Sequence, residues 1–364
     1  MPAISAPWPN PSKMESMAAK WKPGTWSNSP KPCKRPSTSN PTADNQRTLT
    51  VKSPPARPLT DSSPTDTSQS LLLGVGSQRA GSTLLYRLLH QSVKGLFMHP
   101  VKELHVFDSL HHLRPRKALQ SFSKNQLQRL RNQHGDLATA QAKGSKRLIC
   151  EIRTNTIFSE RDISEVNYLD LFRPCLMHHQ WIGEVTPEYM LLSEEQLQGV
   201  HDQFAGHVVP VLMVRNPAKR FLSAYKLRHF YMRPAEQPMP ENDALLSNLN
   251  LLLDQGEEDG WVRAQLRFNQ YREAQQRLQA VFGDRALVLS LDTLTQQPEK
   301  AFQALEDRTG LVVDRPLAET CLQQKVNETD IKLSLDPDTT EKMKTFFAGA
   351  LEDAEQLCGE HLKL

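Results

Sequence analysis

Residues 71–92 read LLLGVGSQRAGSTLLYRLLHQS, and this stretch decides the fold. The apolar run over 71–75 predicts a buried strand, and the glycines at 74, 76 and 81 predict a tight loop after it. A helix is expected over Thr83–Gln91, with its leucines at 84, 85, 88 and 89 facing inward. A strand, a glycine-rich loop and a helix in this order can hold a phosphate, because backbone N–H groups and the positive end of the helix dipole face the anion.

The position of the cation separates this loop from an ATP-binding P-loop. A P-loop has Lys directly after its last glycine, whereas here Ser82 follows Gly81 and the cation, Arg79, lies inside the loop. The alternative is a tight connection that binds nothing, and Arg79, Ser82 and Thr83 in one loop disfavour it. The loop therefore predicts a site for a nucleotide phosphate, and not that of ATP.

The composition is that of a globular protein of 364 residues with a formal net charge of +3. A charge this small does not predict a nucleic-acid or membrane partner. Five cysteines without a CxxC pair disfavour both a disulfide framework and a zinc site. The sequence contains neither an apolar run of membrane-spanning length nor an apolar signal core, so we expect a cytoplasmic protein without a membrane span. It does not indicate the oligomeric state.

Residues 1–68 differ in composition from the rest of the chain. They hold 13 of the 25 prolines, and nine Lys/Arg against four Asp/Glu. Such a segment cannot bury enough apolar surface to offset the chain entropy, so we expect a disordered tail. Residues 69–364 are expected to form one domain, with a polar and basic helical insertion at about 109–180.

Short apolar runs alternate with helical stretches through this domain. Each expected strand is a continuous apolar run, which favours a parallel sheet covered by helices on both faces. The expected strands are 71–75, 180–185, 208–214 and 286–291, and the expected helices are 83–91, 218–230, 261–282, 299–309 and 339–357. The fold class predicted is therefore α/β, a three-layer α/β/α P-loop-like fold with a central parallel sheet.

Three further motifs place polar residues at or near the ends of expected strands. They are KELHVFD at 102–108, GEVTPEY at 183–189 and RNPAKRFLSAY at 215–225. In the last motif a strand ends at Arg215, and Asn216-Pro217 begins a helix. Arg215, Arg220 and Ser223 are expected to converge on a second anion, because guanidinium and hydroxyl groups suit phosphate oxygens.

Together with the loop, these motifs resemble the PAPS-dependent sulfotransferases, where PAPS is 3′-phosphoadenosine 5′-phosphosulfate. The chain looks closest to the branch that contains the heparan-sulfate sulfotransferases and their bacterial relatives. The resemblance covers roughly residues 70–364 and includes LVLSLDTL at 287–294 and VNET at 326–329. It implies that a sulfuryl group moves from PAPS to a hydroxyl or amine of an acceptor, most simply a carbohydrate or glycan, without a metal.

For the 5′-phosphosulfate of the donor, the resemblance implies a loop that begins at Gln78. The groups that would hold the 5′-phosphate are the backbone amides from Ala80 through Gly81 and Ser82 to Thr83, with the hydroxyls of Ser82 and Thr83. Arg79 takes the place of the family's catalytic lysine, where a cation neutralises charge on the leaving phosphate. Arginine departs from the heparan-sulfate branch, but the tyrosylprotein sulfotransferases also carry it there.

The remaining motifs imply roles for six more residues. Arg215 and Ser223 match the family's 3′-phosphate ligands, and Arg220 is a candidate third member. Glu103 matches the general base, which takes the proton of the acceptor hydroxyl, and Asp108 is expected to orient the acceptor. Glu184 is a second candidate base, and Val185 after it stands where many relatives have lysine.

Two other functions remain open from the residues alone. An ATP-dependent small-molecule or nucleotide kinase is disfavoured by the missing P-loop lysine. A non-catalytic phosphoadenosine- or glycan-binding protein would retain Arg215 and Ser223 and is disfavoured by Glu103. His105, His111 and His112 lie close in sequence, but no Cys or carboxylate constellation is apparent to complete a metal site, so no metal is expected.

Overall fold

The computed structural model describes residues 69–173, 180–233, 236–238, 240–324 and 331–362. The expected tail at 1–68 and the VNET motif at 326–329 lie outside these ranges, so neither expectation is tested. Within the described ranges, no helix combines the length and the apolar character that a membrane crossing requires.

A five-stranded parallel sheet forms the centre of the fold, in the order β3-β4-β1-β5-β6. Its strands are β1 Ser70–Gly76, β3 Leu96–Met98, β4 Trp181–Val185, β5 Val208–Val214 and β6 Leu287–Ser290. A separate antiparallel pair joins β2 Val93–Lys94 to β7 Val312–Val313. The sequence predicted four of the five central strands, while β3 is too short to show a periodicity. Because β1 lies between β4 and β5, the chain segments that follow these three strands meet at one edge of the sheet.

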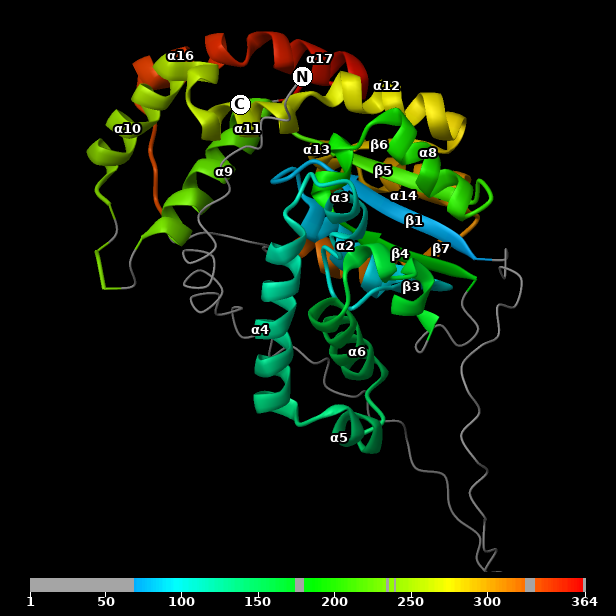
Figure 1. The fold of residues 1–364 in the computed structure, drawn as a ribbon. Helices are drawn as coiled ribbons and strands as arrows, with labels where there is room; N and C mark the ends of the chain where they lie inside the picture. The colour runs from blue at the N-terminus through cyan, green and yellow to red at the C-terminus, as the bar shows by residue number, and fades with distance from the viewer. Residues whose placement is uncertain (1–68, 174–179, 234–235, 239, 325–330, 363–364) are drawn as a thin grey trace, which may run out of the picture. The chain divides into compact units, whose positions relative to one another are not determined.

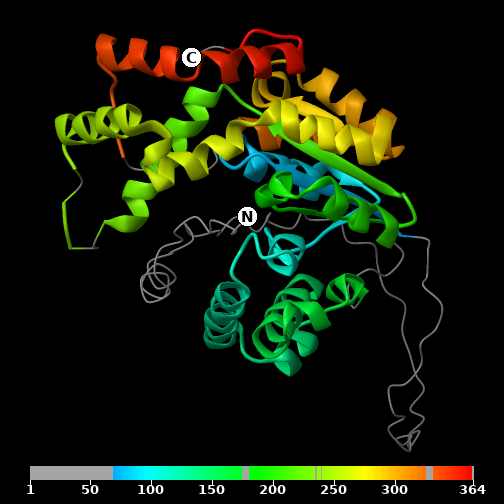
Figure 2. The same ribbon diagram turned by 45° about the horizontal axis from the view of Figure 1, so that its top comes forward.

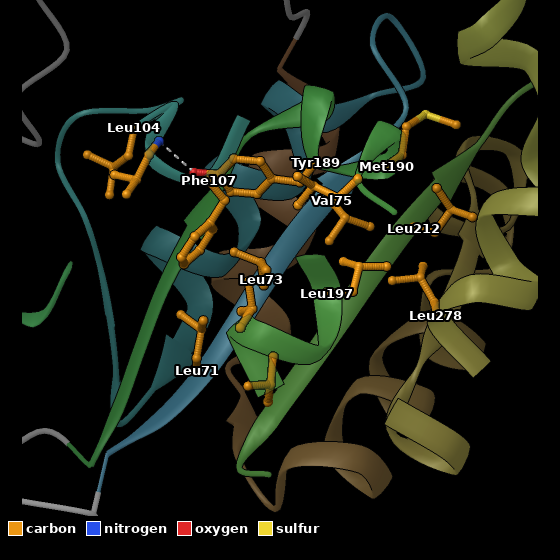
Figure 3. Close-up of a cluster of buried hydrophobic side chains, with 14 of the residues drawn as sticks. Leu71, Leu73, Val75, Leu104, Phe107, Tyr189, Met190, Leu197, Leu212 and Leu278 are labelled. Atoms are coloured by element: carbon orange, nitrogen blue, oxygen red, sulfur yellow. Dashed lines mark hydrogen bonds between the residues drawn. The ribbon is translucent and has the colours of Figure 1, made fainter. Parts of the chain in front are cut away.

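Side chains alternate along β1 between two apolar layers. Leu71, Leu73 and Val75 pack into one cluster, and Leu72 packs into the other. Figure 3 shows the first cluster, in which Leu71, Leu73 and Val75 of β1 are drawn with Leu197 and Leu278 from the helices that cover this face. Both faces of the sheet are therefore buried, as the continuous apolar runs predicted.

Helices cover both faces and complete the three-layer α/β/α fold (Figures 1 and 2). One face packs against α2 Ser82–Ser92, α13 Leu291–Gln296, α14 Pro298–Thr309 and α15 Arg315–Gln323. The other face packs against α8 Glu194–Gln203, α12 Tyr271–Phe282 and α17 Ala348–Cys358. The predicted inward leucines of α2, at 84, 85, 88 and 89, are all buried. The predicted fold class is confirmed.

Two predicted helices are each broken in the structure. The stretch 261–282 divides into α11 Gly260–Leu266, a 3₁₀ turn η5 Arg267–Asn269 and α12. The stretch 339–357 divides at Phe347 into α16 Pro337–Phe346 and α17. Both breaks place a buried aromatic residue, Phe268 or Phe347, into the core, so tertiary packing overrides a continuous helical pattern.

A third apolar cluster joins the helices on the carboxyl-terminal side of β5. It combines α9 Pro217–Met232, α10 Asn242–Gln255, α11 and α16. The aromatic rings of Phe221 and Phe347 lie 5.2 Å apart in it. This cluster fixes α9, which carries the RNPAKRFLSAY motif.

The expected insertion is helical and has a small core of its own. After α3 Val106–Leu110 it forms α4 Arg116–His134, α5 Leu137–Ala142 and α6 Lys146–Glu160. Leu127, Ala140 and Ile152 form its buried cluster. Short 3₁₀ turns, η1 Ile163–Glu165 and η2 Tyr168–Leu171, follow it before β4. Residues 174–179 of the insertion lie outside the described ranges.

A buried histidine after β3 connects the sheet to α6. His99 is fully buried, its Nδ1 accepts from Val101 N at 3.0 Å, and its Nε2 lies 3.1 Å from Thr154 Oγ1. Burial lowers the pKa of His99 to about 4, well below its ordinary value of 6.5. The folded protein therefore keeps this imidazole neutral at pH values where the unfolded chain protonates it.

Stability should therefore fall as the pH drops from about 6.5 toward 4. The unfolded state takes up a proton in this window that folded His99 does not, which lowers the free energy of unfolding by about 2 kcal/mol at pH 5. Urea denaturation at pH 7 and pH 5 measures the difference. His99→Gln should reduce the loss of stability between pH 7 and pH 5, and the surface variant His134→Gln should not. The same pH dependence in the native chain and in both variants would contradict a neutral, buried His99.

Candidate functional site

The loop between β1 and α2 presents an uncapped helix terminus. Gly81, the residue before α2, has φ 97°, a backbone conformation that favours glycine over residues with a Cβ. No side chain caps α2, and its first turn contains no acidic residue. The positive end of its dipole is therefore not neutralised by its own turn, which suits an anion.

Three hydrogen bonds fix the start of this loop. Ser77 N donates to Met213 O of β5 at 2.9 Å, and Ser77 Oγ donates to Phe268 O of η5 at 2.7 Å. Ala80 N donates to Ser77 O at 3.2 Å. The sequence did not indicate a role for Ser77, because its hydrogen bond to Phe268 joins residues that are 191 positions apart in the chain.

Arg79 joins this loop to the RNPAKRFLSAY motif. Its Nε donates to Ser223 Oγ of α9 at 3.0 Å, and its carbonyl accepts from Arg215 Nη1, also at 3.0 Å. Arg79 adopts φ 64°, a left-handed conformation that is uncommon outside glycine. The structure thus brings together three residues that the sequence placed in two anion sites.

The charge of this group is not balanced by a carboxylate in contact. In the described ranges neither Arg79 nor Arg215 forms an ion pair within 4 Å. Burial and then the charge of Arg215 lower the pKa of Arg79, and burial lowers that of Arg215. Two partly desolvated guanidinium groups beside an uncapped helix terminus form a site for negative charge.

The amino terminus of α9 is capped by a side chain, whereas that of α2 is not. Asn216 caps α9 by accepting from Lys219 N at 3.1 Å, and its Nδ2 donates to Leu362 O at 2.9 Å. An anion near this helix must therefore rely on side chains such as Arg215 and Ser223. Asn216 also fixes the start of α9 to the end of the chain.

Arg220 is buried, and its guanidinium N–H groups donate to other groups of the protein instead of to solvent. It is fully buried, and its guanidinium donates to Asn269 Oδ1, to Gln265 O at 2.8 Å, to Gln265 Oε1 at 3.1 Å and to Gln78 O at 3.4 Å. Burial lowers its pKa to about 10. This geometry favours a brace between the loop, α9 and α11–η5 over the expected phosphate contact.

Removing this brace should destabilise the fold. Arg220→Met leaves several buried acceptors without a donor, and we expect the free energy of unfolding to fall by about 3 kcal/mol. Lys219→Met next to it is the control, with an expected change within about 0.5 kcal/mol. Urea denaturation of both variants measures the difference, and equal stability would show that Arg220 is not a brace.

The segment 102–106 lies against the end of β4. Glu103 N donates to Val185 O at 3.2 Å, and Glu103 and His105 have φ of 64° and 54°. The Glu103 side chain is 37 % exposed and pairs with Lys102, while its Oε2 lies 3.9 Å from His105 Nε2. Desolvation opposes ionisation of Glu103, but the charges of Lys102 and His105 outweigh it and lower the pKa. Glu103 is therefore an ionised carboxylate with access to solvent.

Glu184, the second candidate base, is fully buried at the end of β4. It accepts hydrogen bonds from Tyr168 OH at 2.8 Å, Tyr189 OH at 3.0 Å, Thr186 Oγ1 at 2.7 Å and Leu104 N at 3.2 Å. Burial raises its pKa, against the effect of these bonds. The geometry favours an anchor for the 102–106 segment over a base that meets an acceptor.

A buried group around His105 was not found from the sequence. His105 Nδ1 lies 2.8 Å from Asp108 Oδ2 and 3.9 Å from Glu188 Oε2, and its Nε2 lies 3.1 Å from Arg114 Nη1. Burial opposes the charged form of His105, but Asp108 and Glu188 outweigh it and raise the pKa of His105, which favours the imidazolium beside Glu103. When His105 is neutral, Nε2 accepts from Arg114 and the proton is on Nδ1, facing Asp108. Asp108 is fully buried, so it orients His105 and cannot meet the acceptor directly in this conformation.

The spacing of His105 and Asp108 was the available signal for this group. Residues three apart on a helix face each other, and Asp108 follows in the first turn of α3. Glu188 gave no such signal, because it comes from η3 Pro187–Leu191 after β4.

His105, Asp108 and Glu188 offer ligand atoms within 4.8 Å of one another. The expectation that no carboxylate constellation accompanies these histidines is therefore wrong. A metal-bound histidine normally donates its second ring N–H to an acceptor, whereas Arg114 presents a donor to this ring. The surroundings of His105 thus disfavour a metal ion.

A model of the family described as "Sulfotransferase family" matches residues 72–315, which include the loop and the three motifs. A comparison with curated proteins found no match. Among solved structures, the chain is similar to a sulfotransferase from Alicyclobacillus acidocaldarius, with 18% identity and a TM-score of 0.49 over 81% of this chain and 97% of that one.

Proposed function

This chain belongs to the sulfotransferase family, and from that premise we propose that it transfers a sulfuryl group from PAPS to a hydroxyl or amine of a carbohydrate or glycan. The observation that carries the proposal is the Arg79 Nε to Ser223 Oγ hydrogen bond of 3.0 Å. It joins a loop suited to a 5′-phosphate to a motif suited to a 3′-phosphate. PAPS carries negative charge at both positions.

The residues on the donor side fit this substrate. The uncapped amino terminus of α2, with Gly81, Ser82 and Thr83, suits the 5′-phosphosulfate. Arg215 and Ser223 suit the 3′-phosphate, and neither Arg79 nor Arg215 has a carboxylate within ion-pair distance in the described ranges. We assign Arg220 to bracing the loop through Gln78 O.

On the acceptor side we assign the base to Glu103. Its ionised carboxylate takes the proton of the acceptor hydroxyl while the acceptor oxygen forms a bond to sulfur. The bond between sulfur and the bridging oxygen of the 5′-phosphate breaks, and its electron pair leaves with adenosine 3′,5′-bisphosphate. Arg79 neutralises the charge that grows on this leaving group.

His105 and Asp108 position the base in this mechanism. Asp108 fixes the ring of His105, whose Nε2 lies 3.9 Å from Glu103 Oε2. Glu184 holds the backbone of the same segment through Leu104 N. We therefore propose Glu103 as the base and Glu184 as an anchor.

Incubation with ³⁵S-labelled PAPS and a panel of carbohydrate acceptors tests the reaction. We expect transfer of the label to an acceptor, with equal release of adenosine 3′,5′-bisphosphate. Phosphoryl transfer from γ-³²P-labelled ATP to the same panel would favour the kinase alternative. Binding of PAPS without turnover on any acceptor would favour the non-catalytic alternative.

The two phosphate sites can be separated by mutation. Arg215→Gln and Ser223→Ala should each weaken binding of adenosine 3′,5′-bisphosphate, by about 10- to 100-fold for the arginine, because they remove hydrogen bonds to a charged group. Binding of adenosine 5′-monophosphate should change much less. Calorimetry with both nucleotides measures this, and equal losses for the two would contradict a 3′-phosphate site at these residues.

A further inference from the structure

The helix α4 is positively charged, and three of its cations lie along one side. Its 19 residues include five Lys or Arg and no Asp or Glu. Lys117, Lys124 and Arg131 are spaced seven residues apart, which is close to two helical turns, so they lie along one side of the helix. We call these three residues the cationic stripe. Neighbouring charges in it are about 10 Å apart, and the stripe is about 21 Å long.

The stripe is exposed and is not neutralised by ion pairs. All three side chains are exposed, while Leu119, Ser123 and Leu127 of the same helix are buried toward α6. In the described ranges none of the three forms an ion pair within 4 Å, unlike Arg116, which pairs with Asp162 at 2.9 Å. Arg131 is near enough to Asp136 to contribute to lowering its pKa, after the hydrogen bonds from Thr139. The other two cations are therefore the stronger part of the stripe.

The residues beside the stripe are neutral hydrogen-bonding groups. Ser121, Gln128 and Asn132 lie on the adjacent side of α4, and Gln128 Nε2 donates to Asn132 Oδ1 at 2.9 Å. The exposed Phe122 lies about 160° around the helix from Lys124. The stripe thus lacks the aromatic side chains on which bases of single-stranded nucleic acids stack. Cations interleaved with amides and a hydroxyl suit a polymer that carries both carboxylates or sulfates and many hydroxyls.

The stripe begins close in sequence to the proposed base. Five residues separate α3 from α4, and α3 follows directly after Glu103–His105. Figure 1 shows α4 running from the neighbourhood of α3 toward α5, away from the central sheet. Lys117, at the near end, lines a surface pocket together with Arg116 and Arg161. A long acceptor could therefore extend from Glu103 along this helix.

We propose that the cationic stripe binds an extended acidic polysaccharide and is a second contact for the polymer whose hydroxyl reacts at Glu103. The proposal rests on the proposed function for the identity of the polymer. The binding itself does not depend on the proposed reaction, because it is an electrostatic attraction to residues that lie outside the donor site. Binding should weaken as salt increases, since the charges are exposed.

The test compares two variants that lose the same charge. The stripe variant combines Lys117→Gln, Lys124→Gln and Arg131→Gln, and the control combines Lys300→Gln, Arg308→Gln and Lys332→Gln, all at exposed positions. Fluorescence anisotropy with labelled polygalacturonate measures binding without any donor nucleotide. We expect the stripe variant to bind roughly tenfold more weakly than the native chain or more, the control to lose less than about twofold, and uncharged dextran not to bind.

Three results would overturn the proposal. They are no polygalacturonate binding by the native chain, equal losses in the two variants, and tighter binding of a single-stranded oligonucleotide of matched length and charge. Calorimetry with adenosine 3′,5′-bisphosphate keeps this test distinct from that of the proposed function. The stripe variant should bind this nucleotide as the native chain does, whereas failure of the native chain to bind it would contradict the sulfotransfer mechanism and leave the measured polymer binding unchanged.

Discussion

Replacing Arg79 with methionine should lower kcat for sulfuryl transfer by about 10²- to 10³-fold. Arg79 is the only cation of the 77–81 loop, and we propose that it faces the charge that develops on the leaving phosphate. Loss of one such electrostatic partner in other enzymes costs a factor of this size. Single-turnover kinetics with labelled PAPS measures the step without product release.

Arg79→Lys is the matched control for this variant. It keeps the charge but loses the planar donors that reach Ser223 Oγ, so we expect it to retain much more activity than Arg79→Met. The thermal unfolding temperature should be similar in both variants, because Arg79 is only partly buried. If both variants kept native kcat, Arg79 would have no part in the chemical step.

Replacing Glu103 with glutamine should lower kcat by about 10²- to 10⁴-fold, which is the usual contribution of a general base. Binding of adenosine 3′,5′-bisphosphate should not change, because the donor site does not include Glu103. Glu184→Gln is the comparison variant: its loss should appear first in stability, since Glu184 accepts four buried hydrogen bonds.

The pH dependence gives a second test of Glu103. Desolvation opposes its ionisation, but Lys102 and His105 lower its pKa below the ordinary value. The base form therefore persists at acidic pH, and kcat/KM should fall only at pH values below the ordinary glutamate pKa of 4.5. Lys102→Met should raise the pKa of Glu103 and move this acidic limb to higher pH. Native activity in Glu103→Gln, or an acidic limb that Lys102→Met does not move, would contradict the assignment.

The sheet was predictable because its strands are buried on both faces. Continuous apolar runs such as 208–214 leave few alternatives to a parallel strand, and β5 has these bounds. The short strand β3 and the break at Phe268 were not predictable. The first is three residues long, and the second depends on Ser77 and Arg220 meeting η5 across the fold.

The candidate site was only partly readable from the sequence. Arg79, Arg215 and Ser223 gave a recognisable pattern, and the structure places them in contact. Arg220 has the residue type of a phosphate ligand, but its burial could not be read from its spacing. Glu188 and Arg114 reach His105 from separate segments, so only the folded chain reveals them.

Competitive calorimetry with adenosine 3′,5′-bisphosphate and ATP tests the central claim most directly. We expect that adenosine 3′,5′-bisphosphate binds at least tenfold more tightly than ATP, with or without Mg²⁺, and that Arg215→Gln removes most of this preference. Tighter binding of ATP in the presence of Mg²⁺, with no effect of Arg215→Gln, would contradict it.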